Sequence, residues 1–300
     1  MATAGLVAAA ETHDTAAIYD WLMRELSFQG ISDTVAEGYM DRHGNATWAD
    51  IEAALDANPE CNKLHGYWAF TGCGYHKGNQ TCAEPNLFAE CPLPRHPLRN
   101  GRLNQTAYSL ALFIRDVAGG DIVGWIDRQL TDHAGATDLA PARAALLDPL
   151  RNVYGISDKV IGMALAGLLM GTGATRPGWF EVGASFIVVD TLVHNFLHRT
   201  GILHRLAATH PYGPACYRPG GCADVLFAIA MAIDARRFNP AFPRVFPRLI
   251  QRAIWRYCAE TGLNVCNGNQ IDDRGRCDNT GCELYSRCDR LILHDEPKKL

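Results

Sequence analysis

The sequence predicts an all-α protein whose two cysteine-rich segments depend on metal. Apolar residues recur at helical spacing through most of the 300 residues, and no stretch reads convincingly as a strand. Hydrophobic residues make up 48% of the chain and charged residues 20%, which is typical of a globular protein with a sizeable core. Eleven cysteines occur without an export signal, so we expect them to hold metal rather than disulfides.

Helices are expected in most of the chain outside the cysteine groups. Residues 15–28 place Ile18, Leu22 and Leu26 on one helical face, after a cap at Thr15. Thr47, with Asp50 three residues later, caps another helix. The further expected helices are 33–42, 47–57, 104–118, 121–131, 140–150, 223–235 and 244–261, and Gly262 is expected to end the last of them.

Two segments near the middle of the chain stand out. A tight turn at Gly155 leads into an apolar helix that begins near Ser157. A Gly/Pro-rich loop over residues 171–183 then precedes a helix that Asp190 or Thr191 would cap and that ends near Arg199.

The sequences Gly155-Ile156-Ser157-Asp158-Lys159 and Val189-Asp190-Thr191 resemble the hairpin and the following aspartate of the helix–hairpin–helix DNA glycosylases, endonuclease III above all. Upstream, LSFQGISD is similar to a segment of that family, and this places Gln29 where the family's glutamine fills the gap left by an extruded base. The similarity covers about residues 15–57, 104–200 and 244–288. It implies a two-lobed helix–hairpin–helix glycosylase fold with a C-terminal iron–sulfur cluster loop.

The resemblance also implies roles for single residues. Asp190 would stabilise the positive charge that develops on the sugar as the glycosidic bond breaks. Lys159 would attack C1′ and form a Schiff base, which permits strand cleavage. The hairpin, at Gly155 and Ser157, would offer backbone N–H groups to a DNA phosphate. The target base must leave the stack to be reached, so a pocket is required. Apart from the resemblance, we expect His194 to face this pocket or the DNA.

Two residues depart from the family's hairpin. Ser157 replaces its second glycine, and Asp158 replaces the usual basic residue. A carboxylate beside a phosphate-binding turn is unfavourable, so these two positions bear on the phosphate contact and on the class of substrate.

The cysteines of the tail have the spacing Cys266-x10-Cys277-x4-Cys282-x5-Cys288. Four thiolates in a compact segment suit a [4Fe–4S] cluster or zinc, and the resemblance implies the cluster. The interval from Gly262 to Cys266 matches the family and favours Cys266 over Cys258 as the first ligand. The arginines of this tail, Arg274, Arg276 and Arg287, could contact DNA phosphates.

An earlier group, Cys61-x11-Cys73-x8-Cys82-x8-Cys91, has no counterpart in the family pattern. Its even spacing, in a segment without helical periodicity, indicates a second metal site for zinc or an iron–sulfur cluster. His65 and His76 are alternative ligands. The competing interpretation is four buried thiols that act as small apolar residues.

Histidines give a weaker signal. His194 and His198, four residues apart on one helix face, could form a zinc pair, but the accompanying glutamate of such sites is missing. We therefore expect His198 at the surface. Cys216 and Cys222 flank a Pro-Gly-Gly turn, and the sequence indicates only that they hold this loop together.

The predicted organisation has a terminal lobe from residues 1–57 and 201–300, a cysteine-rich insertion over 58–103, and a helical lobe over 104–200 that carries the hairpin. The expected partner is double-stranded DNA, although a net charge of −4 is not typical of nucleic-acid-binding proteins. We expect a monomer in the cytoplasm, associated with the nucleoid, because neither a signal peptide nor a membrane span is visible.

The function predicted is a DNA glycosylase that excises a damaged or modified base, with AP lyase activity through Lys159. Two alternatives stay open. One is a non-catalytic iron–sulfur module that binds DNA, and the other is a redox iron–sulfur protein with two clusters. The sequence does not identify the base, because pocket specificity would depend on loops such as residues 171–183.

Overall fold

The prediction of an all-α chain is confirmed in the computed structural model, in which 58% of the residues are helical. It describes residues 4–28, 31, 33–57, 60–76, 79, 81–82, 91–94, 103–173, 175–266 and 271–293. Within these ranges the only β-type pairing is an isolated bridge between His76 and Thr81.

The chain divides into two compact units, unit 1 over Met1–Gly183 and unit 2 over Ala184–Leu300. This division differs from the expected one, since residues 1–57 fall in unit 1 and residues 201–300 in unit 2. The units are described separately below.

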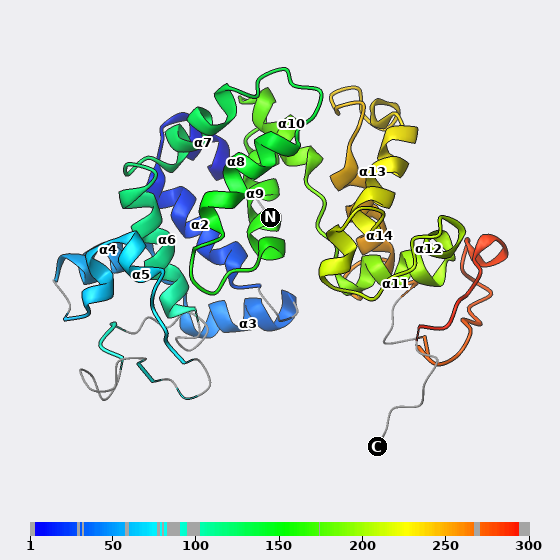
Figure 1. The fold of residues 1–300 in the computed structure, drawn as a ribbon, viewed down its shortest axis with the longest axis horizontal. Coiled ribbons are helices and arrows are strands. Elements are labelled where there is room, and N and C mark those ends of the chain that lie inside the picture. The colour runs from blue at the N-terminus through cyan, green and yellow to red at the C-terminus, as the bar shows by residue number, and fades with distance from the viewer. Residues whose placement is uncertain are drawn as a thin grey trace. The chain divides into compact units, whose positions relative to one another are not determined.

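Unit 1 is built around α2 (Thr15–Leu26), which packs against four other helices (Figure 1). Its buried face includes Ile18, Tyr19 and Met23, none of which is exposed to solvent. The other helices of this unit are α1 (Ala4–Glu11), α3 (Asp33–His43), α4 (Trp48–Asp56), η1 (Asn62–His65), α5 (Tyr67–Phe70), α6 (Asn104–Asp116), α7 (Ile122–Thr131), α8 (Ala140–Leu150), α9 (Asp158–Gly171) and α10 (Pro177–Ser185), which ends just beyond the boundary.

The helix starts show how far local chemistry predicts the fold. Thr47 and Asp50 form the expected capping box at the start of α4. The cap of α2, however, is Asp14 and not Thr15, because the Asp14 carboxylate accepts a hydrogen bond from the Ala17 N–H at 3.0 Å. The Thr15 hydroxyl instead donates to the carbonyl oxygen of Gly120, which ties α2 to the turn before α7.

The segment expected to be a Gly/Pro-rich loop, residues 171–183, contains most of α10. Pro177 begins the helix, where its missing N–H costs nothing, and Trp179 and Val182 are buried. Gly183 is needed for close packing, since a Cβ there would lie 2.9 Å from the Cβ of Leu169 on α9. Tertiary burial therefore outweighs the low helix propensity of this composition.

In unit 2, α11 (Thr191–Arg199) and α13 (Cys222–Ala232) both pack against α14 (Pro247–Cys258) (Figure 1). Their shared core contains Val193, Leu197 and Leu226. The short helices α12 (Ile202–Arg205), η2 (Pro214–Tyr217), η3 (Ala235–Arg237) and η4 (Tyr285–Arg287) complete this unit. Helix α14 ends before the predicted stop, since Ala259 is already extended and the Gly262 N–H donates to the Ala259 carbonyl.

Among the described residues, no helix combines the length and the apolar character that crossing a bilayer requires.

Candidate metal centres and catalytic residues

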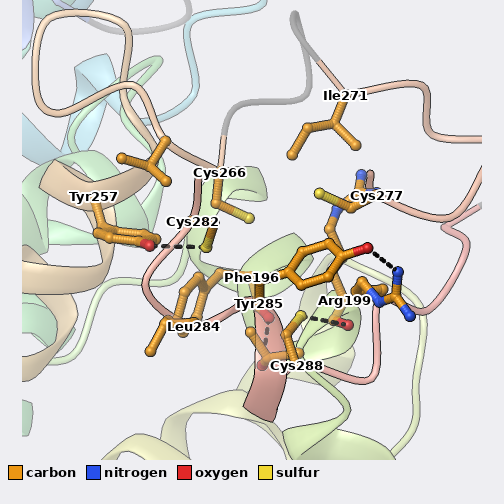
Figure 2. Close-up of a pocket in the computed structure, with 13 residues that line it drawn as sticks. Phe196, Arg199, Tyr257, Cys266, Ile271, Cys277, Cys282, Leu284, Tyr285 and Cys288 are labelled. Atoms are coloured by element: carbon orange, nitrogen blue, oxygen red, sulfur yellow. Dashed lines mark hydrogen bonds between the residues drawn. The ribbon is translucent and has the colours of Figure 1, made fainter. Parts of the chain in front are cut away.

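The four tail cysteines line one pocket in unit 2. Cys266, Cys277, Cys282 and Cys288 come from separate stretches of the tail, and Figure 2 shows their sulfur atoms facing the same space. Phe196 and Arg199 of α11 and Tyr257 of α14 complete the wall. The two helices thus provide a scaffold for a tail that contains few buried apolar residues of its own.

The electrostatics of this pocket favour negatively charged sulfur. The thiol of Cys258 lowers the pKa of Cys266 by hydrogen bonding, and the charge of Arg199 lowers it further. The same hydrogen bond and burial raise the pKa of Cys258, which does not line the pocket. Cys266 is thus the better anionic ligand of the two, and Cys258 is its donor.

Arg199 is the only strongly buried cation of this site among the described residues. It is 3% exposed, and its Nη2 donates to Asp273 at 2.6 Å. Its Nη1 is buried and has no hydrogen-bond partner among the described residues. A buried N–H without a partner costs free energy, so a bound anionic group in the pocket would relieve that cost. The hydroxyl of Tyr257 also lies 3.1 Å from the Cys282 sulfur.

The spacing of the tail thiols bears on which metal group the pocket could hold. Four thiolates around one zinc ion have sulfur atoms about 3.8 Å apart, given Zn–S bonds of about 2.3 Å in a tetrahedron. Among the described residues, the tail cysteines form no group whose ligand atoms all lie within 4.8 Å. A multi-iron cluster holds its thiolates farther apart than a single ion does, so this spacing is compatible with a cluster.

The first cysteine group also converges. Cys61, Cys73, Cys82 and Cys91 line one pocket in unit 1, whereas His65 and His76 are not part of its wall. Burial raises the pKa of Cys73, and the thiols of Cys91, Cys61 and Cys82 raise it further, although a backbone hydrogen bond lowers it.

These four thiols are not a dry apolar cluster, because only Cys61 is fully buried. Like the tail thiols, they form no group whose ligand atoms all lie within 4.8 Å among the described residues. The arrangement therefore matches the predicted second site in its ligands and leaves open whether zinc or a cluster fills it.

A third group, which we call the His/Cys group, unites His194, His210, Cys216 and Cys222 in unit 2. Their four ligand atoms all lie within 4.8 Å of one another and could hold a metal ion. Cys216 and Cys222 are fully buried, and none of the eleven cysteines of the chain forms a disulfide.

The His/Cys group corrects the expectation for His194, and the structure places His198 in a partly buried position. His194 is 6% exposed and its Nδ1 lies 3.3 Å from the Cys222 sulfur, so it faces two thiols and not DNA. His198 is not its partner in a zinc pair, because the Nε2 of His198 lies 3.3 Å from the carbonyl oxygen of Ile292. The even spacing His210-x5-Cys216-x5-Cys222 was a signal for three of the ligands, but only the fold brings His194 to them.

The predicted hairpin lies between α8 and α9, which are in contact. Gly155 has φ of +76°, a left-handed conformation that glycine adopts without strain. Val153 is buried at the base of the turn, and Ser157 is the N-cap position of α9. The local structure is therefore two helices joined by a tight turn at the predicted residues.

The unexpected acidic residue of the hairpin, Asp158, is paired. Its carboxylate accepts a hydrogen bond from Arg151 at 2.9 Å, and Arg151 also binds Asp148. The next residue, Lys159, is half-buried and forms no ion pair or hydrogen bond with the described residues. Arg151 therefore offsets the charge of Asp158, and Lys159 is left available.

Asp190, in unit 2, caps α11. Its Oδ1 accepts a hydrogen bond from the Val193 N–H at 2.9 Å. A largely buried guanidinium is close by: burial lowers the pKa of Arg248 to about 10, Arg252 lowers it further, and the charges of Asp190 and Tyr217 raise it. The carboxylate is thus held at a helix N-terminus within range of a buried cation.

The remaining site predictions are placed as follows. Gln29 lies outside the described residues. Arg274, Arg276 and Arg287 are exposed on the tail around the four cysteines. Lys159 belongs to unit 1 and Asp190 to unit 2.

Comparison with protein-family models, with characterised proteins and with solved structures gave no match for this chain.

Proposed function

We propose that this chain is a DNA glycosylase that excises a damaged or modified base from double-stranded DNA. The observation that carries the proposal is the hairpin between α8 and α9, where Gly155 is left-handed at the predicted turn. A turn of this kind presents the first N–H groups of the following helix, which suit a phosphate. The proposal also rests on the sequence resemblance of the segments around Lys159 and Asp190.

In the proposed reaction Asp190 stabilises the positive charge that develops on the sugar as the base leaves. Its position as a cap fits this role, because the Val193 N–H holds one carboxylate oxygen in place. A preorganised charge costs no reorganisation when the reaction takes place. The buried Arg248 nearby favours the ionised carboxylate, since opposite charges attract more strongly away from water.

Lys159 would be the nucleophile that forms a Schiff base with C1′ of the sugar. Its amine is not committed to an ion pair with any described residue, because Arg151 takes Asp158. The chain has only five lysines, so a covalent adduct with DNA has few possible origins.

A [4Fe–4S] cluster in the tail pocket is part of the proposal, and its role would be to stabilise that segment. The four thiols, the buried Nη1 of Arg199 and the hydroxyl of Tyr257 all suit such a group. Exposed arginines on the same tail, Arg274 and Arg287, would then lie where they can contact DNA phosphates.

The test is reductive trapping with a panel of duplexes that carry damaged bases or an abasic site. Borohydride should fix a protein–DNA adduct with the wild-type protein, and both Lys159→Ala and Lys159→Arg should abolish it. The arginine variant is the matched control, because it keeps the charge that phosphate contacts need and removes only the nucleophile.

Each other outcome has a distinct meaning. An adduct that survives in Lys159→Arg places the nucleophile elsewhere. Base release without an adduct makes the enzyme monofunctional, with Asp190 activating water. If the protein binds duplexes and neither releases a base nor forms an adduct, the glycosylase proposal is wrong and a non-catalytic module replaces it.

A second candidate, a redox protein with two clusters, is favoured by one observation. Two separate pockets are each lined by four cysteines, one in unit 1 and one in unit 2. Iron analysis gives about eight irons per chain if both hold cubane clusters and about four if only one does. Reversible reduction of two clusters, with no activity on any duplex, would support this candidate.

A further inference from the structure

The His/Cys group draws its ligands from three parts of unit 2. His194 lies on α11, His210 and Cys216 lie in the segment between α12 and α13, and Cys222 is the first residue of α13. The Nδ1 of His194 is 3.3 Å from the Cys222 sulfur and 3.5 Å from the Cys216 sulfur. The Nε2 of His210 is 3.3 Å from the Cys222 sulfur. Four soft or borderline donors therefore converge on one point.

These distances match the edges of one coordination tetrahedron. Zinc bonds of about 2.3 Å to sulfur and about 2.0 Å to nitrogen place a nitrogen and a sulfur ligand about 3.5 Å apart. Three of the nitrogen–sulfur edges measure 3.3–3.5 Å. The tail cysteines form no such compact group among the described residues.

The tautomer of His210 also indicates that this residue can coordinate a metal. Its Nδ1 lies 2.6 Å from the carbonyl oxygen of Ala208, and because a carbonyl can only accept, Nδ1 carries the proton. The Nε2 lone pair is then directed at the His/Cys group. A histidine that donates from one ring nitrogen to a backbone carbonyl and faces a site with the other is the usual arrangement at a metal.

Charge balance selects a divalent ion. A divalent cation with two thiolates and two neutral imidazoles is a neutral unit, and the two protons of the thiols leave to solvent on binding. A neutral unit suits this position, because Cys216 and Cys222 are both unexposed and belong to the apolar core with Val193 and Leu226. The start of α13 also favours a thiolate at Cys222, as the N-terminal end of a helix dipole attracts negative charge.

The segment that would be fastened has few other contacts with the rest of unit 2, chiefly the hydroxyl of Tyr217, which accepts a hydrogen bond from the Val189 N–H at 2.9 Å. Between Leu206 and Gly220, Cys216 is the only buried residue, and Leu206, Tyr212 and Tyr217 are exposed. Positive φ angles occur in this segment at Ala207, Gly213 and Gly220. Fixing the backbone of such a segment in one conformation costs conformational entropy. Metal binding supplies folding free energy in such segments.

We propose that His194, His210, Cys216 and Cys222 bind one zinc ion, which fastens the segment between α12 and α13 to α11. Four protein ligands leave no open position, so the ion is structural and not catalytic. Zinc is preferred over copper or nickel because tetrahedral sites with two histidines and two cysteines suit a metal without a geometric preference of its own. The proposal does not depend on the proposed glycosylase reaction.

The experiment compares metal content in full-length protein and four variants. The wild-type protein should contain zinc, and Cys222→Ser and His210→Ala should each lose about one zinc ion per chain while the iron content and visible absorbance stay unchanged. His204→Ala is the matched control, because His204 is an exposed histidine on neighbouring α12 that lies outside the group. It should keep all of its zinc.

The variant His210→Cys tests whether the zinc loss in His210→Ala results only from misfolding. Three cysteines and one histidine still make a zinc site, so this variant should retain the ion that His210→Ala loses. Protein loaded with cobalt should show the absorption of a tetrahedral thiolate complex, and the contribution of one bound ion should be lost in Cys222→Ser and persist in Cys282→Ser. Equal zinc in wild type and Cys222→Ser would overturn the proposal, as would a Cys216–Cys222 disulfide in freshly isolated protein.

Discussion

Helix α11 contributes to two candidate metal centres, and the two are built in different ways. At its C-terminal end, Phe196 and Arg199 help to form the pocket of the four tail cysteines. In its middle, His194 belongs to the compact His/Cys group. The tail pocket has partly exposed thiols and a buried cation, whereas the His/Cys group has closely spaced ligands that are all buried except the partly exposed His210.

The difference suits the two proposed occupants, a cluster in the tail pocket and one zinc ion in the His/Cys group. A cluster with four thiolate ligands carries net negative charge and needs room, exposure and positive partners, which Arg199 and the half-exposed cysteines provide. A single zinc ion with two thiolates and two imidazoles is neutral, so it can lie in an apolar core without a counter-ion.

The largest predicted effect comes from removing one ligand of the tail. Cys282→Ser should lose the brown colour and about four irons per chain, and it should lower solubility, because the tail buries few apolar residues of its own. Its zinc content should not change. Visible absorbance, iron and zinc analysis and thermal unfolding measure these effects on one preparation.

The reciprocal variant completes the comparison. Cys222→Ser should lose zinc and keep iron, since none of its ligand partners lines the tail pocket. If either substitution removed both metals, the two centres would be one cooperative unit and not two independent ones. A colourless, iron-free wild-type protein that still excises bases would contradict the cluster assignment and leave the proposed reaction standing.

The sequence predicts features that depend on neighbouring residues. The capping box of Thr47 and Asp50 is local, and α8 begins and ends where its pattern indicates, at Ala140 and Leu150. The two predicted sets of four cysteines, the first chosen by spacing and the tail set by spacing together with the family resemblance, each line one pocket. Short segments bring such residues together with few folding alternatives.

Features that depend on tertiary structure escaped prediction. Helix α10 forms in a Gly/Pro-rich stretch because Trp179 and Val182 gain burial, which propensity does not measure. His194 joins the His/Cys group across 15 intervening residues, and only the packing of α11 beside the segment of His210 places it there. Asp14 replaces Thr15 as a cap because the Thr15 hydroxyl donates a hydrogen bond to the carbonyl oxygen of Gly120, about a hundred residues away.

A further prediction tests whether Asp190, the N-cap of α11, is catalytic, and it depends on neither metal. Asp190→Asn should lower base excision by about 100-fold, since losing a preorganised charge costs a few kcal/mol of transition-state stabilisation. Iron and zinc contents should be unchanged, because asparagine also caps helices well and preserves α11. Single-turnover kinetics on the substrate identified by the duplex panel measure the rate.

Asp234→Asn is a suitable control for this variant. Asp234 also caps a short helix, through the Arg236 N–H, and lies outside both metal centres. Its substitution should leave the rate unchanged. An Asp190→Asn enzyme with the wild-type rate would mean that Asp190 serves only as a cap.

The smallest predicted effect concerns the hydroxyl of Tyr257, which lies 3.1 Å from the sulfur of Cys282. Tyr257→Phe removes that hydrogen bond and keeps the ring, so iron content should stay at the wild-type value. The hydroxyl stabilises the more negative, reduced form of a cluster more than the oxidised form. Its removal should therefore lower the midpoint potential by about 40 mV, which corresponds to about 1 kcal/mol for one electron.

Tyr285→Phe separates this effect from a general change in the pocket. Tyr285 lies in the same wall, but its hydroxyl accepts a hydrogen bond from Arg290 at 2.7 Å and bonds to no cysteine (Figure 2). Because its loss leaves the sulfur atoms with the same donors, the potential should shift much less than in Tyr257→Phe. Equal shifts in the two variants would show that solvent access to the pocket, and not hydrogen bonding to sulfur, sets the potential. Zinc bound at the His/Cys group should respond to neither substitution, since both tyrosines lie outside that group.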